Sequence, residues 1–319
     1  DMVSPLDGLR AVYGDKVAYA KGYAAGRPMY GRADEIPQNV VDSLRAEAVE
    51  MAKKADLVVL VGGLNKNHFQ DCDGLPFGQD ELIEALLGVN KNLVLVLLSG
   101  NAVEMPWVSR VPAIVQGWYL GSMGGKSLAD ILSGAVNPSG KLPFSFPAKL
   151  TDCGAHAFDE LSYPGDSIKQ EYKEDILVGY RWHDTKEIPA LFPFGHGLSY
   201  TTFTYGKPVA SAKAMAADGT LTVTVAVKNT GSIAGKEIVQ LYVGDDKCSV
   251  LRPVKELKHF AKVGLAPGEE KSVTFTLTPD DLKFYDEASA AWKYEPGKFK
   301  AYVCASSADV RGVVSFEMQ

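Results

Sequence analysis

The sequence lacks an apolar run near the roughly 20 residues that a membrane-spanning helix needs, so we expect no membrane-embedded part. No signal peptide opens the chain, although that absence is uninformative for a processed or truncated product. The chain also lacks a basic stripe. It has 33 Lys and Arg against 39 Asp and Glu, with both signs mixed throughout and a net charge of -6. We therefore expect neither a nucleic-acid nor a membrane partner.

Cysteine is scarce and scattered, at positions 72, 153, 248 and 304. No two of these residues form a CxxC pair with the spacing of metal ligands. A free buried thiol is the expected state of each, and the sequence indicates no metal site and no cofactor.

A nucleotide-binding fingerprint is also missing. Gly62-Gly63 follows an apolar run, but the GxGxxG spacing and the acidic residue about 20 positions later are absent. A nucleotide-dependent enzyme stays open only because an α/β fold does not dictate function.

The 319 residues are enough for two domains. In the first part, apolar strands alternate with amphipathic helices, which predicts a mostly parallel sheet with right-handed crossovers. The expected helices are 5–13, a second helix that begins at Ser43 with this serine as its N-cap, 79–91 and 126–132. The expected strands are 16–21, 57–61, 93–98 and 113–116.

The sequence pattern changes near Asn137, where closely spaced prolines exclude a helix interior. In 174–183 the side chains alternate in the manner of a strand. From Thr202 onward, alternating segments separated by turns predict an all-β sandwich of the immunoglobulin or fibronectin III type, with strands at 220–228, 236–243, 271–277 and 298–303. The predicted domains are therefore an α/β sandwich over 1–201 and a β-sandwich over 202–319.

The first candidate for chemistry is the polar loop 65–74, which carries His68, Gln70, Asp71 and Asp73. It follows the apolar strand 57–61, which reads as buried on both faces. Ligands of open parallel sheets bind where strands end and loops like this one gather.

Several segments together carry a resemblance to a known family: 56–65, 75–81 (Leu-Pro-Phe-Gly-Gln-Asp-Glu), 99–101, 116–121, 137–147, 174–184, 191–200, 249–260, 265–269 and 292–297. In this order they resemble the C-terminal half of a glycoside hydrolase family 3 enzyme of the β-glucosidase type. That resemblance implies an α/β sandwich followed by a fibronectin-type-III-like domain. It also implies a separate (β/α)₈ barrel, without a counterpart in this sequence, that holds the aspartate nucleophile.

The resemblance further implies that the acid/base residue comes from a loop like 68–74. The family's Glu-Gly-x-Asp-Arg stretch is absent, however, because Asp71-Cys72-Asp73 runs directly into Gly74. Two alternatives stay open. The loop is short, with Asp73 or Asp71 standing in or catalysis lost, or the natural loop holds residues that this sequence does not show.

The resemblance implies that the chain supplies the acid/base loop of a retaining, exo-acting enzyme that removes terminal β-D-glucosyl residues, with a β-xylosidase as the next choice. His68, Phe69 and Gln70 would border the substrate, a β-linked oligosaccharide or glucoside. The barrel, on another chain or in another segment of the same enzyme, would be the partner, and the isolated chain would be inactive. A homo-oligomer stays open, and a periplasmic or secreted location is favoured over a cytoplasmic one.

The competing hypothesis is a non-catalytic carbohydrate-binding or assembly module. For the remaining motifs we expect structural roles. Tyr180, Arg181 and His183 are expected at a strand end in a salt-bridged interdomain contact. Trp292 and Phe299 are expected in the core of the β-sandwich.

Overall fold

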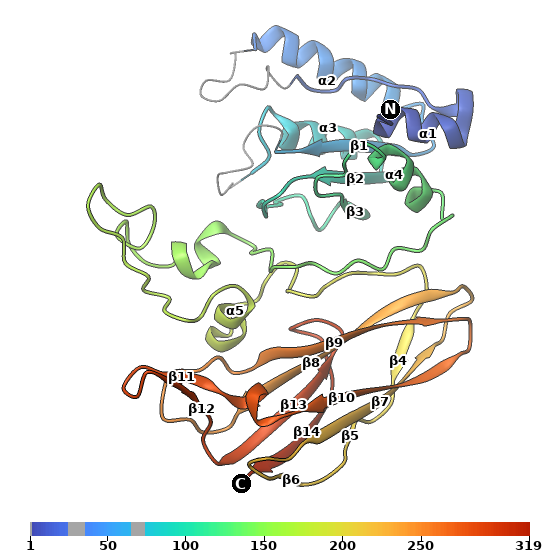
Figure 1. The fold of residues 1–319 in the computed structure, drawn as a ribbon. Coiled ribbons are helices and arrows are strands. Elements are labelled where there is room, and N and C mark those ends of the chain that lie inside the picture. Colours follow the sequence, from blue (N-terminus) through green and yellow to red (C-terminus); the bar gives the residue numbers. More distant parts are fainter. Residues whose placement is uncertain (1, 25–35, 65–73) are drawn as a thin grey trace. The chain divides into compact units, whose positions relative to one another are not determined.

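The computed structural model describes residues 2–24, 36–64 and 74–319 (Figure 1). The chain divides into two compact units. The first consists of Asp1–Val136 with Ala148–Leu150, and the second of Asn137–Pro147 with Thr151–Gln319. This division by compactness does not test a domain boundary at residue 201, which stays a prediction.

The first unit contains a three-stranded parallel sheet in the order β1-β2-β3. Its register pairs Val58 with Leu93 and Val94 with Ala113. The strands are β1 (Val58–Gly63), β2 (Leu93–Leu98) and β3 (Ala113–Gln116), and the helices are α1 (Pro5–Tyr13), α2 (Gln38–Ala52), α3 (Gln79–Val89) and α4 (Gly124–Leu132). The predicted alternation of strand and helix is confirmed.

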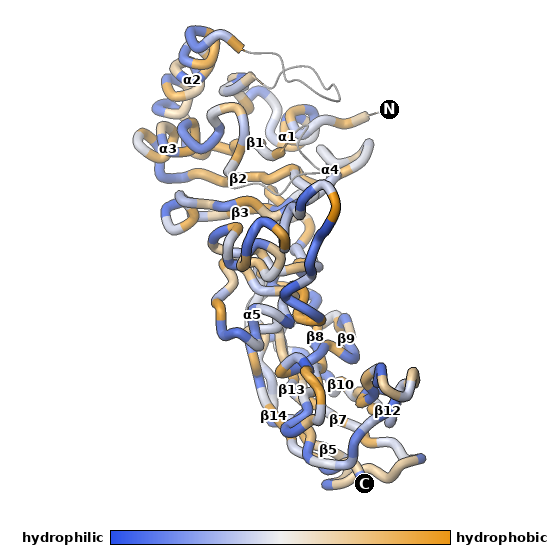
Figure 2. Tube along the Cα trace, turned by 90° about the vertical axis from the view of Figure 1, so that its left-hand side faces the viewer, coloured by the Kyte–Doolittle hydropathy of each residue, from blue (hydrophilic) through white to orange (hydrophobic). Residues whose placement is uncertain are grey.

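The middle strand β2 carries the core of this unit. Leu95, Val96 and Leu97 are fully buried, and the hydropathy colouring of Figure 2 shows the strand as mostly orange. The prediction that β1 is buried on both faces is wrong. Leu57 is 54% exposed, and the strand residues 58–61 are half-buried. Within the described residues β1 pairs only with β2, so it lies at the edge of this sheet.

Two other local predictions fail at the N-terminal end. Residues 16–21 do not form a strand, because the chain passes from a 3-10 turn at Gly14–Lys16 into an irregular segment without a pairing strand among the described residues. The second helix begins at Gln38 rather than at Ser43. Pro37 precedes it with a φ of -56°, which the ring fixes close to the helical value.

The second unit contains two antiparallel sheets. One has the order β10-β7-β4, with β5 also paired to β7, and the other has the order β6-β14-β13-β8-β9, in which the short β6 alone pairs in parallel. The strands are β4 (Phe203–Tyr205), β5 (Val209–Ala210), β6 (Ala214–Met215), β7 (Leu221–Asn229), β8 (Gly235–Asp245), β9 (Glu256–Leu265), β10 (Glu270–Leu277), β13 (Gly297–Cys304) and β14 (Val310–Met318).

Alternation along these strands places every second side chain in one core. In β7, Leu221, Val223, Val225 and Val227 are buried, and Phe299 of β13 joins them at 1% exposure. The predicted sandwich and the predicted place of Phe299 are confirmed.

The alternating segment 174–183 is not a strand. Its C-terminal end forms the helix α5 (Tyr180–Lys186), which starts after Gly179, whose φ is +61°. Ile176 and Val178 are largely exposed, so the alternation does not mark a buried face. The Tyr180 hydroxyl accepts a hydrogen bond from the Leu257 N–H of β9 at 2.9 Å, and Arg181 pairs with Glu256 at 3.5 Å. The predicted ion-pair role of Arg181 therefore holds, but from a helix.

A two-stranded ribbon, β11 (Phe284–Asp286) and β12 (Ala291–Lys293), lies outside both sheets. Trp292 belongs to this ribbon and is 65% exposed, so its predicted place in the core is wrong. It pairs across the ribbon with Tyr285 instead of pointing into the sandwich.

Candidate active site

The candidate site is the edge of the first unit where the three parallel strands end. The loop residues predicted to carry chemistry, His68, Phe69, Gln70, Asp71 and Asp73, lie outside the described residues. The structure does describe both ends of that loop, at Leu64 and Gly74, and the side chains that hold those ends.

Gln79, the first residue of α3, ties the two ends together. Its side chain is buried, at 1% exposure. The Gly63 N–H donates to Gln79 Oε1 at 2.8 Å, while Gln79 Nε2 donates to the carbonyls of Gly63 at 2.9 Å and Pro76 at 2.7 Å. One amide thus satisfies backbone groups before and after the loop, which fixes the distance between its two ends.

Close packing explains why residues 62 and 63 are both glycine. A Cβ at Gly62 would lie 2.4 Å from Gln79 Oε1, and a Cβ at Gly63, whose φ is +151°, would lie 2.0 Å from the Leu98 carbonyl oxygen. Neither position can accept a side chain without moving the loop ends. The glycines make room for the Gln79 amide and for β2, which explains them without a bound nucleotide.

Asp80 holds the C-terminal end of the loop in place. The Leu75 N–H donates to Asp80 Oδ2 at 3.2 Å, and the indole N–H of Trp107 donates to Oδ1 at 2.6 Å. Trp107 is fully buried. Between Leu75 and α3, Phe77 and Gly78 both have positive φ, +64° and +69°, so the chain turns sharply into the helix.

Polar side chains also lie where β2 and β3 end. Gln116 Nε2 donates to the Ser99 carbonyl and contacts the Ser99 hydroxyl, both at 3.0 Å. Gln116 Oε1 is shielded from water and has no hydrogen-bond partner within the described part of the chain. Tyr119, three residues further on, is 63% exposed. This edge therefore carries polar side chains that are held by hydrogen bonds, together with one exposed tyrosine.

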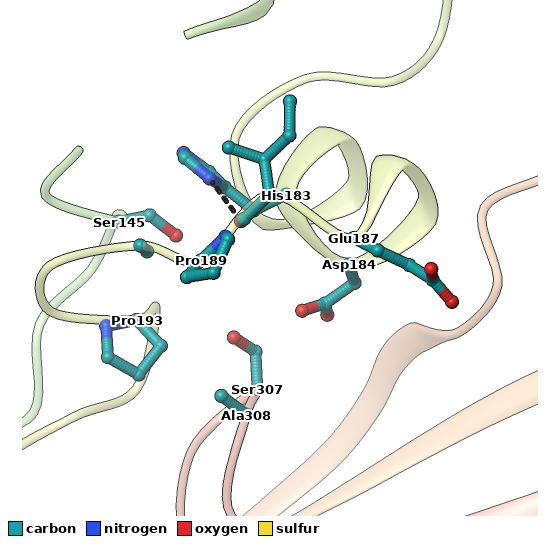
Figure 3. A pocket seen from close by; sticks show the side chains of 10 residues that line it. Ser145, His183, Asp184, Glu187, Pro189, Pro193, Ser307 and Ala308 are labelled. Carbon is teal, nitrogen blue, oxygen red and sulfur yellow. Dashed lines mark hydrogen bonds between the residues drawn. The ribbon is translucent and has the colours of Figure 1, made fainter. Parts of the chain in front are cut away.

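A pocket of about 240 Å³ lies in the other unit (Figure 3). Asp184 and Ser307 point into it, and His183 turns its Nδ1 to the Ile188 carbonyl at 3.0 Å. Asp184 pairs with Lys255 at 2.7 Å, and burial raises the pKa of the Asp184 carboxyl in spite of the hydrogen bond from that lysine. The Asp184 carboxylate is therefore engaged in an ion pair with a buried lysine.

Among the described residues, no group of three His, Cys, Asp or Glu side chains is arranged to hold a metal ion. None of the helices in the described part is both long enough and apolar enough to cross a membrane.

Comparison with known families identifies both parts of the chain. Residues 1–200 match the glycosyl hydrolase family 3 C-terminal domain, and residues 237–307 match a fibronectin type III-like domain. The chain therefore belongs to glycosyl hydrolase family 3. The fold class predicted from the sequence, an α/β part followed by a fibronectin III-like sandwich, is confirmed.

Individual relatives agree with this assignment. A β-glucosidase of Bacteroides ovatus is 67% identical over 99% of this chain and 43% of the relative, and one of Rhizobium radiobacter is 46% identical over 86% of this chain and 34% of the relative. The crystal structure of a family 3 β-glucosidase from Bifidobacterium adolescentis superposes with a TM-score of 0.87 at 36% identity, covering all of this chain and 45% of that one. The chain thus spans less than half the length of these relatives.

Sequence reasoning missed Gln79 and Asp80 as the residues that hold the loop. Both belong to the segment Leu-Pro-Phe-Gly-Gln-Asp-Glu, which carried part of the family resemblance. A glutamine at the first position of a helix, directly after a turn, is a signal that could have found the first of them.

Proposed function

We propose that this chain is the C-terminal portion of a retaining, exo-acting β-glucosidase and supplies the acid/base loop to a separate (β/α)₈ barrel that carries the nucleophile. The observation that carries the proposal is the 67% identity to a β-glucosidase over 99% of the chain. The geometry supports it, because the loop that would bear the acid grows from the edge where strands β1, β2 and β3 end.

Two carboxyl groups do the chemistry of a retaining glycosidase, about 5–5.5 Å apart across the scissile bond. One attacks the anomeric carbon while the other protonates the leaving oxygen. The second then takes a proton from a water molecule as that water attacks the anomeric carbon, which breaks the bond to the first carboxylate and releases the sugar. In this proposal Asp73 is the proton donor from this chain, with Asp71 as its alternative. His68, Phe69 and Gln70 border the sugar or the leaving group.

Aspartate is one methylene shorter than glutamate, so an acid at position 73 depends on where the backbone of the loop stands. Gln79 and Asp80 fix both ends of that backbone through hydrogen bonds of 2.7–3.2 Å. We therefore assign Gln79 the role of a positioning residue for the acid. A misplacement of about 1 Å costs on the order of 100-fold in rate in such sites.

The substrate in this proposal is a terminal β-D-glucosyl residue of an oligosaccharide or glucoside. A β-xyloside is the next choice, because the pocket that selects the sugar would come mostly from the barrel. The comparisons do not favour the alternative of a purely non-catalytic module, since the relatives described above carry the name β-glucosidase.

A chimera tests the proposal. This chain replaces the matching C-terminal segment of the Bacteroides ovatus β-glucosidase, and hydrolysis of 4-nitrophenyl β-glucoside is followed. We expect turnover by the chimera and none by the isolated chain. A single cooperative unfolding transition and binding of glucose would show that the chimera has folded. A folded, glucose-binding chimera without turnover, or robust turnover by the isolated chain, would contradict the proposal.

A further inference from the structure

The β11–β12 ribbon exposes two large aromatic side chains that packing within the chain does not explain. Tyr285 and Trp292 face each other in register, with ring centroids 5.7 Å apart and ring planes at 71°. They are 51% and 65% exposed. Neither the Tyr285 hydroxyl nor the Trp292 indole N–H has a hydrogen-bond partner among the described residues, so both polar groups stay available to a ligand.

The ribbon beneath the pair is firmly held. Phe284 is buried at its base, with the Arg252 guanidinium 5.6 Å and the Lys293 ammonium 5.9 Å from its ring centroid. Lys293 of β12 also forms an ion pair with Asp286 of β11 at 2.8 Å, which links the two strands. The aromatic pair therefore stands on a rigid support and loses little freedom when a ligand stacks on it.

Charge beside the pair favours an uncharged ligand. Asp286 is neutralised by Lys293, and Asp280 by Lys283 at 2.6 Å. Glu295 accepts a hydrogen bond from the Ser249 N–H at 2.9 Å. Both lysines of the segment 283–293 are thus paired, and neither is left to attract an anion.

The size of the aromatic surface favours a small, flat unit. Two such side chains have about 150–250 Å² each, of which roughly half to two thirds is exposed here. This is well below the roughly 800 Å² that each partner contributes to a standard protein interface. A pyranose ring, with apolar C–H faces and polar hydroxyl edges, matches an aromatic face that is bordered by hydrogen-bonding groups.

We propose that Tyr285 and Trp292 form a carbohydrate-binding platform, on which a pyranose unit of a neutral β-linked glucan stacks. The choice of a β-linkage rests on the proposed function, whereas the stacking itself does not. The platform holds a polymer without cleaving it, and it belongs to the fibronectin III-like part of the chain.

Native gels cast with barley mixed-linkage β-glucan, hydroxyethylcellulose or α-linked pullulan test the platform with the whole 319-residue chain. We expect the two β-glucans, but not pullulan, to retard migration. Trp292→Ala should weaken binding about tenfold or more, and Trp292→Phe should fall between that variant and the wild type. Phe260→Ala removes a 68% exposed aromatic from β9 and is the matched control, which should migrate like the wild type.

Fluorescence gives a second readout. Of the four tryptophans, Trp107 and Trp182 are buried, so a blue shift on adding glucan should come chiefly from Trp292 and vanish in Trp292→Ala. Equal retardation of all variants, retardation by pullulan alone, or a concentration-dependent dimer that Trp292→Ala abolishes would overturn the platform. Binding needs no turnover, so this result and the chimera's activity can fail separately.

Discussion

Replacing Gln79 by leucine tests how the ends of the loop are held. Leucine has nearly the same size as glutamine but makes none of its three hydrogen bonds to Gly63 and Pro76. The buried N–H and C=O of Gly63 would lose these side-chain partners. We expect the first unit to lose stability while its α/β fold persists.

The magnitude follows from the number and burial of these bonds. A hydrogen bond contributes about 0.5–1.5 kcal/mol net, and a buried polar group that is left unpaired costs about 1–3 kcal/mol. With three bonds lost at a side chain that is 1% exposed, and with part of the cost returned by the more apolar leucine, we expect about 2–5 kcal/mol. That is a large fraction of the roughly 5–15 kcal/mol that stabilises a typical domain.

Urea unfolding followed by tryptophan fluorescence measures the effect, because the buried Trp107 reports on the first unit. Gln38→Leu is the matched control. Gln38 is likewise the first residue of a helix, α2, but its side chain bonds only to Asp42 at 2.9 Å on the surface. We expect the control to stay within about 0.5 kcal/mol of the wild type. A Gln79→Leu variant that is as stable as the control would refute the reasoning.

Three further predictions concern single contacts. Gly62→Ala places a Cβ 2.4 Å from Gln79 Oε1 and should cost about 1–3 kcal/mol in urea unfolding, and a wild-type midpoint would contradict this. Trp107→Phe removes the 2.6 Å bond to Asp80 and leaves a void, so about 2–4 kcal/mol should be lost, and an unchanged midpoint would argue against the contact. Hydrogen bonds from Lys293 and then Ser289 lower the pKa of Asp286 to about 2 from its usual 3.8, so its contribution is present above pH 3.8 and lost as pH falls toward 2. The stability difference between the wild type and Asp286→Asn should therefore shrink across that window, and a difference independent of pH would contradict the assignment.

Patterns that depend on local periodicity predicted most of the fold. The apolar run at 93–98 and the alternation at 220–228 became β2 and β7, because a central strand and a sandwich strand bury their side chains in just these patterns. The segment 174–183 alternates equally well but ends in α5. Its course depends on Gly179 and on the docking of Tyr180 against β9, which periodicity does not encode.

The sequence predicted where the candidate site lies, but it did not predict the contacts that support it. The end of the strand at Gly63 located the loop, since ligands of parallel sheets bind at such edges. The bonds of Gln79 and Asp80 join residues that are 3–27 positions apart, and pattern reasoning did not reveal them. Trp292 was misplaced because a large aromatic in an alternating segment usually points inward, whereas its ribbon lies outside both sheets. The roles of Asp73, Asp71, His68, Phe69 and Gln70 stay predictions.

The most direct test of the central claim, that this chain delivers the proton, is Asp73→Asn in the chimera. Loss of a general acid should slow cellobiose hydrolysis by roughly 10²–10⁴-fold. It should spare the first step with 2,4-dinitrophenyl β-glucoside, whose leaving group needs no proton, so kcat/KM for this substrate should stay near the wild-type value. The second step loses its base and slows, so azide, which needs no base to attack the glucosyl-enzyme, should restore turnover and yield a glucosyl azide. Equal losses on both substrates without rescue by azide, or unchanged cellobiose hydrolysis in both Asp73→Asn and Asp71→Asn, would contradict the claim.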